Sequence, residues 1–363
     1  MPRTINPQES TGSKMKSVIF LAADIGATKT NICLYTFSGR LTAVSPPVQF
    51  RTADFSGIEA LAATFLSGRK IAMDFCVFGV PGPVDNGRAK ITNLPWVMDE
   101  KKIQRGLSVT TVRLINDLEA TSHAVTELSA NDLFTLSAAK TDGNGNKAVI
   151  APGSGLGESF LTWDKTSYTC FASEGGHGDF APNSKIECAL FEYLQDKYGH
   201  VSYERVCSGQ GIENIYQFLK DRHYEKEPAW LTREFQSAGK DPVPLIVETA
   251  LDTKRPCPIC VKTITLFTAV LGAEAGNLGL RILAKGGVYL AGGLPQRVLP
   301  FLKEKAFLHA FHQKGRMSGL IKEMPLYVIT NPEAGLMGAA RYGVFHLLPD
   351  EPEIKGYGRI LKN

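Results

Sequence analysis

The sequence has little of several features that would point to particular classes of protein. Its seven cysteines are scattered and odd in number, which argues against a disulfide framework and predicts reduced thiols and a cytoplasmic location. The formal net charge is only +4, and no dense run of Lys and Arg with interleaved aromatics occurs, so nucleic acid is not an expected partner. No apolar run approaches the length of a membrane span, so we expect no membrane association.

Two further absences concern targeting signals and metals. Residues 1–16 carry basic side chains but lack the apolar core of a secretory signal, and they predict a disordered lead-in. Cys257 and Cys260 form a C-x-x-C pair, but no second pair and no H-x-x-x-H lies nearby to complete a zinc tetrahedron, so two thiols at the start of a helix is the favoured interpretation. The remaining composition, 44% hydrophobic and 21% charged over 363 residues, is that of a globular protein long enough for two domains.

Two segments, "VIFLAADIGATKTNICLY" and "AVIAPGSGLGESFLTW", share one pattern: an apolar strand, a turn of small residues and a second apolar strand. The pattern predicts a duplicated β-hairpin, with strands at 18–23 and 31–37 in the first copy. Small residues let the backbone approach a ligand, and successive N–H groups in such a turn form an anion site. Asp24 would repel a bare phosphate but suits one that carries Mg²⁺, directly or through water. Neither turn matches a P-loop or a dinucleotide-binding fingerprint.

Two more segments suggest ligand contacts. Gly292 and Gly293 follow the apolar run "VYLA" and precede a predicted helix, a place where a flat ring or a phosphate can pack; a tight strand–helix turn explains them equally well. The segment "SEGGHGDFAPN" presents Glu174, His177 and Asp179 among glycines, which suits a polyhydroxylated ligand. A metal site or a charged loop are the alternatives, and a metal is disfavoured because few further ligands lie nearby.

Asn116 and Asp117 end the predicted strand "TVRLI", where α/β enzymes place their chemistry. Asp117 has two interpretations: it caps the following helix, or it accepts a proton from a substrate hydroxyl. On local sequence alone the cap is favoured.

Together the motifs resemble the bacterial glucokinase family, in the actin/hexokinase/Hsp70-like superfamily. The resemblance runs from about Val18 to Leu348 and rests on blocks that occur in the family's order: "LINDLEA", "GSGLG", "EGGHGDFAP" and "HVSYERVCSG". It implies an α/β fold of two ribonuclease-H-like (actin-like ATPase) domains with a deep interdomain cleft. The expected divisions are a lead-in (1–16), a small domain (17–127 plus 331–350), a large domain (128–330) and a C-terminal tail (351–363). A homodimer is expected because family members are commonly dimers.

The resemblance also implies ATP-dependent phosphorylation of glucose, with Mg²⁺ as cofactor and site residues in named roles. Asp117 matches the catalytic base, and Asp24 would hold Mg²⁺ through water. The residues that match sugar-binding positions are Asn93, Asn116, Asp117, Glu174, His177 and Glu204. Those that match the ATP site are Ala23, Asp24, Ile25, Gly26, Ala27, Thr28, Gly153, Ser154, Gly155, Gly157, Gly292 and Gly293.

The sequence departs from the family's pattern at a few positions. Ala27 stands where a second glycine is common, Lys29 adds a cation beside the phosphates, and Ser154 replaces a threonine while keeping the hydroxyl. The related repressor/open-reading-frame/kinase sugar kinases usually carry a cysteine-rich zinc motif, which this chain lacks, so the zinc-free glucokinase branch is favoured. Two alternatives stay open: a kinase for another hexose or an amino sugar, including one that uses polyphosphate, and a non-catalytic sugar sensor on the same fold.

Overall fold

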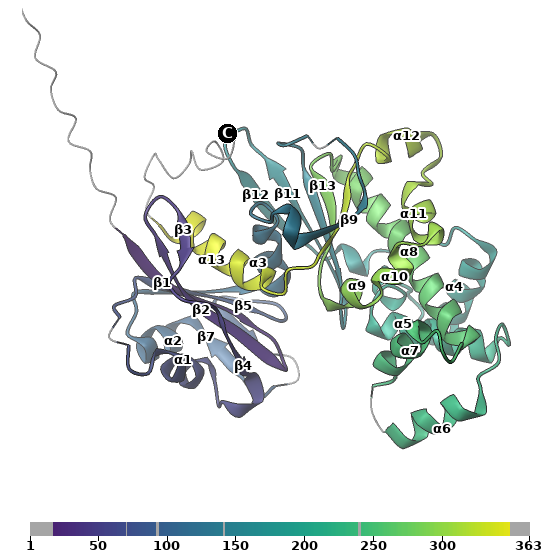
Figure 1. Cartoon of the computed structure of the whole chain (residues 1–363), viewed down its shortest axis with the longest axis horizontal. Helices are drawn as coiled ribbons and strands as arrows, with labels where there is room; N and C mark the ends of the chain where they lie inside the picture. Colours follow the sequence, from purple (N-terminus) through teal and green to yellow (C-terminus); the bar gives the residue numbers. More distant parts are fainter. Residues whose placement is uncertain (1–16, 70, 92–93, 141, 239–240, 349–363) are drawn as a thin grey trace, which may run out of the picture. The chain divides into compact units, whose positions relative to one another are not determined.

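The computed structural model describes residues 17–69, 71–91, 94–140, 142–238 and 241–348. These residues form two compact units, which we describe separately (Figure 1). Unit 1 comprises 17–116 and 339–348, and unit 2 comprises 117–338. The second boundary falls inside helix α13 (Ala334–Leu347), so both units share this helix.

The sheet of unit 1 is built on the first predicted hairpin. Its strands run in the order β3-β2-β1-β5-β8, and β4 pairs with β2. The hairpin partners β1 and β2 are antiparallel, whereas β1 pairs with β5 and β5 with β8 in parallel, so the predicted hairpin is confirmed. The strands are β1 (Val18–Ile25), β2 (Lys29–Phe37), β3 (Leu41–Ala43), β4 (Val48–Arg51), β5 (Phe75–Val80) and β8 (Thr111–Asn116).

Helices cover both faces of this sheet because side chains alternate along its strands. On one face, Phe78 of β5 packs in a core with residues of α1 (Ile58–Leu66) and α2 (Glu100–Leu107). On the other face, Gly343 of α13 lies so close to Phe75 and Val77 of β5 that a Cβ there would overlap the Phe75 ring. A short ribbon of β6 (Arg88–Lys90) and β7 (Val97–Asp99) leads into α2, and the Asp99 carboxylate caps that helix by accepting from two backbone N–H groups.

The sheet of unit 2 also has six strands and repeats the main path of the first sheet, extended by β9 at one edge. Its order is β12-β11-β10-β13-β14-β9, with β10–β11 and β11–β12 antiparallel, and with β10–β13 and β13–β14 parallel. The duplication that the sequence predicted is therefore confirmed. The strands are β9 (Leu133–Ser137), β10 (Lys147–Pro152), β11 (Leu156–Trp163), β12 (Tyr168–Ser173), β13 (Gly287–Leu290) and β14 (Leu326–Ile329).

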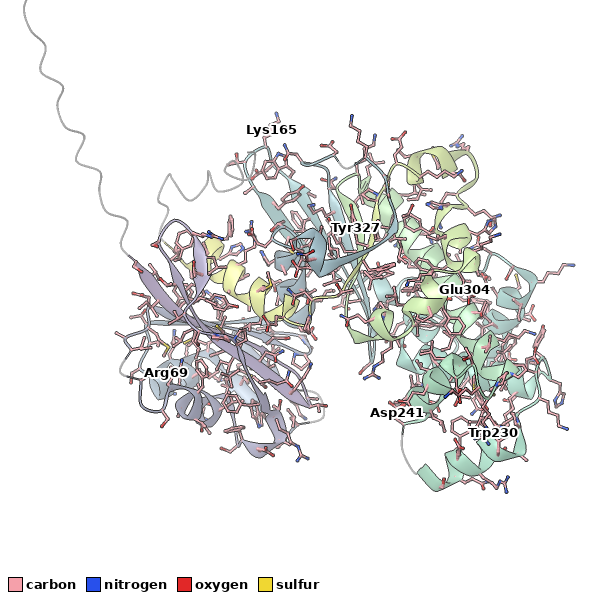
Figure 2. All side chains as sticks on the ribbon, in the orientation of Figure 1. Arg69, Lys165, Trp230, Asp241, Glu304 and Tyr327 are labelled. Atoms are coloured by element: carbon pink, nitrogen blue, oxygen red, sulfur yellow. The ribbon has the colours of Figure 1, made fainter. Side chains whose placement is uncertain are left out.

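Aromatic contacts occur both within the sheet and among the helices of unit 2. Tyr327 of β14 stacks on Tyr289 of β13 with ring centroids 5.1 Å apart (Figure 2). The guanidinium of Arg255 lies 3.4 Å from the ring centroid of Trp230 on α6, a cation–π contact that anchors this helix (Figure 2). The helices of the unit besides α13 are α3 (Asp117–Ala124), α4 (Lys185–Tyr198), α5 (Gly209–Asp221), α6 (Ala229–Ala238), α7 (Pro242–Leu251), α8 (Pro258–Ile282), α9 (Gly293–Arg297), α10 (Leu299–Leu302), α11 (Lys305–His312) and α12 (Ser318–Ile321).

Helix α8 is the central helix of unit 2. Gly272 and Gly276 let α11 approach so closely that a Cβ at either position would lie 2.5 Å from a backbone carbonyl oxygen of that helix. By length and composition α8 is also the one helix in the described part of the chain that could cross a membrane, yet 78% of its apolar window is buried inside the unit. Lys262 and Glu274 interrupt the apolar residues of α8, and the burial is that of a core helix.

We expect truncation of a buried valine in unit 1 to destabilise it far more than truncation of an exposed one. Val112 on β8 is 1% exposed and Val97 on β7 is 65% exposed. Val112→Ala should lower the free energy of unfolding by about 2 kcal/mol, from lost transfer energy plus a cavity. Val97→Ala should change it by less than about 0.5 kcal/mol. Denaturant unfolding followed by circular dichroism measures both, and equal effects would contradict the core that we describe.

Candidate functional site

The first glycine turn connects β1 to β2 in unit 1. The Gly26 N–H donates to the Lys29 carbonyl at 2.9 Å, and a Cβ on Gly26 would lie 2.9 Å from that same oxygen. Only glycine fits this approach without a shift of the backbone. Asp24 is half-buried at the end of β1, paired with Asn31 of β2, and Thr28 at the tip of the turn is exposed. The turn thus presents backbone and hydroxyl groups to solvent beside a carboxylate.

A threonine that sequence reasoning missed fixes this turn from behind. Thr52 is fully buried, and its hydroxyl donates to the Gly26 carbonyl at 2.7 Å. That hydroxyl also lies 2.9 Å from the hydroxyl of Thr30, while the Thr52 N–H donates to the Thr28 carbonyl at 3.1 Å. The sequence signal is weak, because Thr52 stands far along the chain in an unremarkable segment.

The second glycine turn connects β10 to β11 in unit 2. The Gly153 N–H donates to the Gly155 carbonyl at 2.8 Å, and the Gly209 N–H at the start of α5 donates to the Gly153 carbonyl at 2.8 Å. Ser154 lies exposed at the tip. Hydrogen bonds within the turn and to the start of α5 therefore hold the turn in place, while Ser154 stays accessible to solvent.

The Gly292–Gly293 segment lies beside this second turn. The Ala291 N–H donates to the Ile150 carbonyl of β10 at 2.9 Å, and a Cβ on Gly292 would be 3.5 Å from the Pro152 carbonyl oxygen. Gly292 has φ +87°, a conformation that favours glycine, and Gly293 begins α9. The structure thus brings two sequence-predicted glycine sites of unit 2 together.

Glu204 joins the second turn to the predicted sugar-binding segment. One of its carboxylate oxygens accepts the Leu156 N–H at 3.0 Å, and the other lies 3.9 Å from Nδ1 of His177. The opposite ring nitrogen of His177 lies 3.7 Å from a Glu174 oxygen. The side chains of Glu204, His177 and Glu174 are 28%, 59% and 91% exposed, so this trio has hydrogen-bonding capacity directed to solvent.

Packing explains the two glycines between Glu174 and His177. They lie in a 3₁₀ turn, η3 (Gly175–His177), which rests on β11. A Cβ on Gly176 would overlap the Leu156 carbonyl oxygen, and a Cβ on Gly175 would overlap a carboxylate oxygen of Glu158. The glycine pair is needed because the turn lies against the strand that follows the second glycine turn.

The predicted catalytic aspartate lies at the junction of a strand and a helix. Asn116 ends β8 and its amide donates to the Gly82 carbonyl at 3.0 Å, while Asp117 is the first residue of α3. The Asp117 Oδ1 atom accepts the Leu118 N–H at 2.9 Å. Because Asp117 begins α3, its carboxylate lies at the positive end of the helix dipole.

The predicted residues are divided between the two units. Asp24, the rest of the first turn and Asn116 belong to unit 1, whereas Asp117 and the second-turn, Glu204 and Gly292 groups belong to unit 2. Asn93 lies outside the described residues. An arrangement that joins the two sets therefore stays a prediction.

Two other features of the described residues bear on metals. No group of three or more His, Cys, Asp or Glu side chains in this part of the chain is arranged to hold a metal ion. Cys257 and Cys260 are buried at the start of α8 with their sulfur atoms 3.5 Å apart, as the thiol interpretation predicts. Burial, followed by the neighbouring Cys257, raises the pKa of the Cys260 thiol, which disfavours a thiolate ligand.

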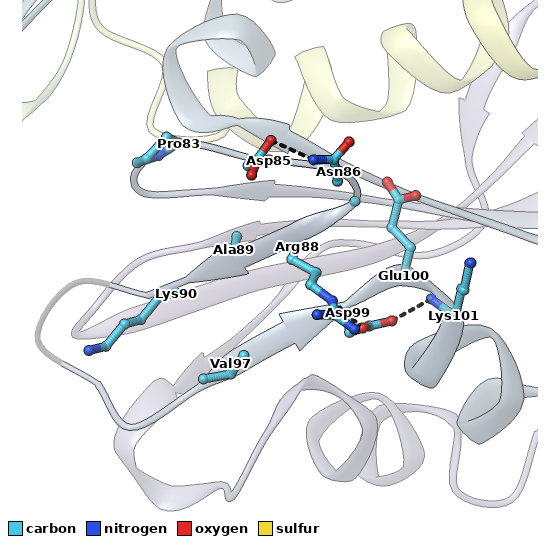
Figure 3. A pocket seen from close by; sticks show the side chains of 11 residues that line it. Pro83, Asp85, Asn86, Arg88, Ala89, Lys90, Val97, Asp99, Glu100 and Lys101 are labelled. Atoms are coloured by element: carbon cyan, nitrogen blue, oxygen red, sulfur yellow. Dashed lines mark hydrogen bonds and ion pairs between the residues drawn. The ribbon is translucent and has the colours of Figure 1, made fainter.

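A pocket of about 590 Å³ opens in unit 1 against the β6–β7 ribbon and contains none of the predicted site residues (Figure 3). In its wall Arg88 lies 2.7 Å from Asp99, and the Asn86 amide donates to the Asp85 carboxylate at 3.0 Å. We assign it no ligand.

Comparisons with known proteins agree on one family. The family model described as glucokinase matches residues 21–344. A glucokinase of Trichormus variabilis is 40% identical over 336 residues, covering 89% of this chain and 98% of the relative. A glucokinase of Synechocystis sp. is 36% identical over 344 residues, covering 89% and 97%.

Solved structures give the same result for the fold. The structure of a glucokinase from an Antarctic psychrotroph has a TM-score of 0.74 at 28% identity, covering 89% of this chain and 98% of that one. A ROK family glucokinase from Streptomyces griseus, solved in complex with glucose and AMPPNP, has a TM-score of 0.56 at 18% identity, covering 89% and 98%. Such structures have the actin-like ATPase fold, in agreement with the α/β fold class that the sequence predicted.

We expect removal of the Glu204 carboxylate to loosen the second glycine turn. A hydrogen bond to a charged acceptor contributes roughly 1.5–3 kcal/mol, so Glu204→Ala should speed amide exchange of Leu156 by roughly ten- to a hundredfold. Hydrogen–deuterium exchange of a peptide spanning 153–157 measures this. Glu192→Ala, which truncates an exposed glutamate on α4, is the matched control. Unchanged exchange in Glu204→Ala would show that the contact does not restrain the turn.

Proposed function

Because this chain belongs to the glucokinase family, we propose that it phosphorylates D-glucose with ATP, giving glucose 6-phosphate and ADP. The observation that carries the proposal is the Glu204 junction, where one carboxylate contacts both the second glycine turn and His177. A kinase must hold its two substrates in line, and a shared anchor couples a phosphate-binding turn to a sugar-binding group.

The sugar is bound by the carboxylates and by His177. We call η3 (Gly175–His177) and η4 (Tyr203–Arg205), with the adjoining Glu174, the sugar turns. Each carboxylate oxygen of Glu174 and Glu204 accepts hydrogen bonds from sugar hydroxyls, and Asn116 both donates and accepts. Asn93 completes the set as the family resemblance implies. A site of this kind rejects analogues that leave its polar groups unpaired.

The nucleotide is bound by the two glycine turns and the Gly292–Gly293 segment. Backbone N–H groups of both turns and the hydroxyls of Thr28 and Ser154 stabilise charge on the phosphates. Adenosine packs against Gly292, whose lack of a side chain keeps the surface flat. Ala23 and Ile25 flank the first turn on β1, and Gly155 and Gly157 flank the tip of the second.

Mg²⁺ fits the first turn because the half-buried Asp24 carboxylate supplies the oxygen ligand that a hard cation prefers. We propose that Asp24 holds Mg²⁺ through water. The ion would neutralise phosphate charge during transfer.

Asp117 accepts the proton of the sugar 6-hydroxyl as the phosphoryl group is transferred. The domains that the sequence predicted, 17–127 with 331–350 and 128–330, would form a cleft that closes on glucose. Closure would exclude water, the competing acceptor of the phosphoryl group. A homodimer and a cytoplasmic location remain predictions from the family resemblance and the cysteine content.

We expect Asp117→Asn to abolish most of the activity without abolishing sugar binding. Loss of a general base lowers kcat by about 10²–10⁴-fold, while the isosteric amide preserves the shape of the site. Glucose-dependent ADP release measures turnover, and calorimetry measures glucose binding. Asp196→Asn, at an exposed position of α4, is the matched control and should keep full activity. A mutant within tenfold of the wild type would remove Asp117 from its proposed role.

A substrate panel separates the proposal from its alternatives. We expect ADP release with glucose to exceed that with mannose, galactose, fructose and N-acetylglucosamine, and ATP to be a better donor than polyphosphate. Preference for another sugar would retain the mechanism and change the substrate. Tight glucose binding without turnover on any sugar or donor would favour a sensor.

A further inference from the structure

A group of charged side chains is buried beneath the sugar turns. Glu158 on β11 is 1% exposed and Glu274 on α8 is completely buried. Side chains alternate along a strand, so Ser159 faces Ser122 of α3, while Glu158 points to the opposite side of the sheet, toward α8. Two carboxyl groups are thus buried in one place.

The two carboxyl groups differ in the hydrogen bonds and ion pairs that they make. Nη1 of Arg281 lies 2.6 Å from a Glu274 oxygen but 3.8 Å from the nearer Glu158 oxygen. Asn277 donates to the second Glu274 oxygen at 2.9 Å. Both Glu158 oxygens, by contrast, are buried and accept no hydrogen bond from a donor group among the described residues. A buried carboxylate without hydrogen bonds is costly, whereas a neutral carboxyl is much less so.

Each carboxyl group contacts the support of one sugar turn. A Cβ on Gly175 of η3 would overlap a Glu158 oxygen, so this carboxyl forms the surface on which η3 rests. Asn277, which donates to Glu274, also lies 3.0 Å from the hydroxyl of Tyr203, the first residue of η4. The residue after Tyr203 is Glu204. The buried pair therefore lies directly beneath the groups that bind sugar in the proposed function.

We propose that Glu158 is a positioning residue that acts in its neutral, protonated form, keeping η3 in place for glucose binding. The inference rests on the proposed function. If Glu158 ionised, its charge would face Glu274, and the half-exposed Arg281 is already engaged with that residue at short distance. The buried ion would then draw water or displace Gly175, and the sugar turn would shift.

The pKa of Glu158 agrees with this geometry. Burial, reinforced by the Glu274 carboxylate and opposed by Arg281, raises the pKa of Glu158 from 4.5 to about 7. Because the folded-state pKa is raised, the stabilisation from the neutral form is complete below about pH 4.5 and is lost as pH rises through about 7. Above pH 7, we expect glucose binding to weaken as Glu158 ionises.

Other groups around the pair limit the useful pH range. Burial lowers the pKa of Lys314, which donates to Asn277 at 2.7 Å, to about 8. Burial also raises the pKa values of the Tyr203 hydroxyl and the Cys207 thiol, so both stay neutral. A comparison between pH 6 and pH 8, made against a variant that changes only Glu158, isolates its titration from theirs.

Glu158→Gln tests the proposal because glutamine has the shape of a neutral glutamic acid and does not titrate. At pH 6 we expect wild type and Glu158→Gln to have the same KM for glucose within twofold, because Glu158 of the folded protein is still mostly protonated. The melting temperature of the wild type should fall relative to that of Glu158→Gln between about pH 4.5 and pH 7, where the unfolded chain is ionised at this position and the folded chain is not. At pH 8 the wild-type KM should exceed that of Glu158→Gln by about tenfold, as follows for a group one unit above its pKa. The kcat values should stay within twofold of each other, because Glu158 touches no reacting atom. The wild type should also melt below Glu158→Gln at pH 8.

Three outcomes would overturn the proposal. Failure of Glu158→Gln to fold at pH 6, or a higher KM at both pH values, would mean that the charged form is needed as a partner of Arg281. Identical KM and melting profiles for both proteins would mean that Glu158 does not titrate in this range. Glu192→Gln, on the surface of α4, should follow the wild type throughout. Absence of wild-type turnover at both pH values would overturn the proposed function, while the melting comparison still decides the protonation state of Glu158.

Discussion

The carboxylate of Glu204 accepts the N–H of Leu156, which lies 48 residues earlier in the sequence, and the arrangement around the second glycine turn depends on that contact. One oxygen receives the Leu156 N–H and the other faces His177. Gly155 makes this contact possible, because a Cβ there would lie 2.5 Å from the Glu204 oxygen. The second glycine turn and the sugar turns thus share one charged anchor, and a shift in either is transmitted to the other through a single side chain.

The two units present a glycine turn from sheets of similar topology. Each contains an antiparallel hairpin whose first strand has a parallel neighbour on its other side. The first strand is flanked on both sides within the sheet, while the tip of each hairpin turn is exposed. The supports differ, however. Buried Thr52 holds the first turn through its hydroxyl, whereas Glu204 and the start of α5 hold the second.

Local sequence patterns predicted the two hairpins well, because the residues that form each hairpin are neighbours in the sequence. Apolar strands interrupted by small residues indicated both hairpins. Long-range supports escaped prediction. Thr52, Glu158 and Glu274 carry no motif, and their roles arise only when folding brings them beside a turn. The sequence around a glutamate does not show whether its side chain is buried or exposed, so the sequence alone does not identify Glu158 or Glu274 as buried.

The packing of η3 on β11 has a consequence for changing sugar preference by design. The path of the turn is set by contacts behind it, with the Leu156 carbonyl and the Glu158 carboxyl, and not by the side chains that point to solvent. Substitution of Glu174 or His177 should therefore leave the backbone of η3 unchanged. A library of variants at these two positions would present new hydrogen-bonding groups to sugar hydroxyls from an unchanged backbone. A library that also varies Gly175 and Gly176 would consist largely of variants in which η3 is displaced from β11.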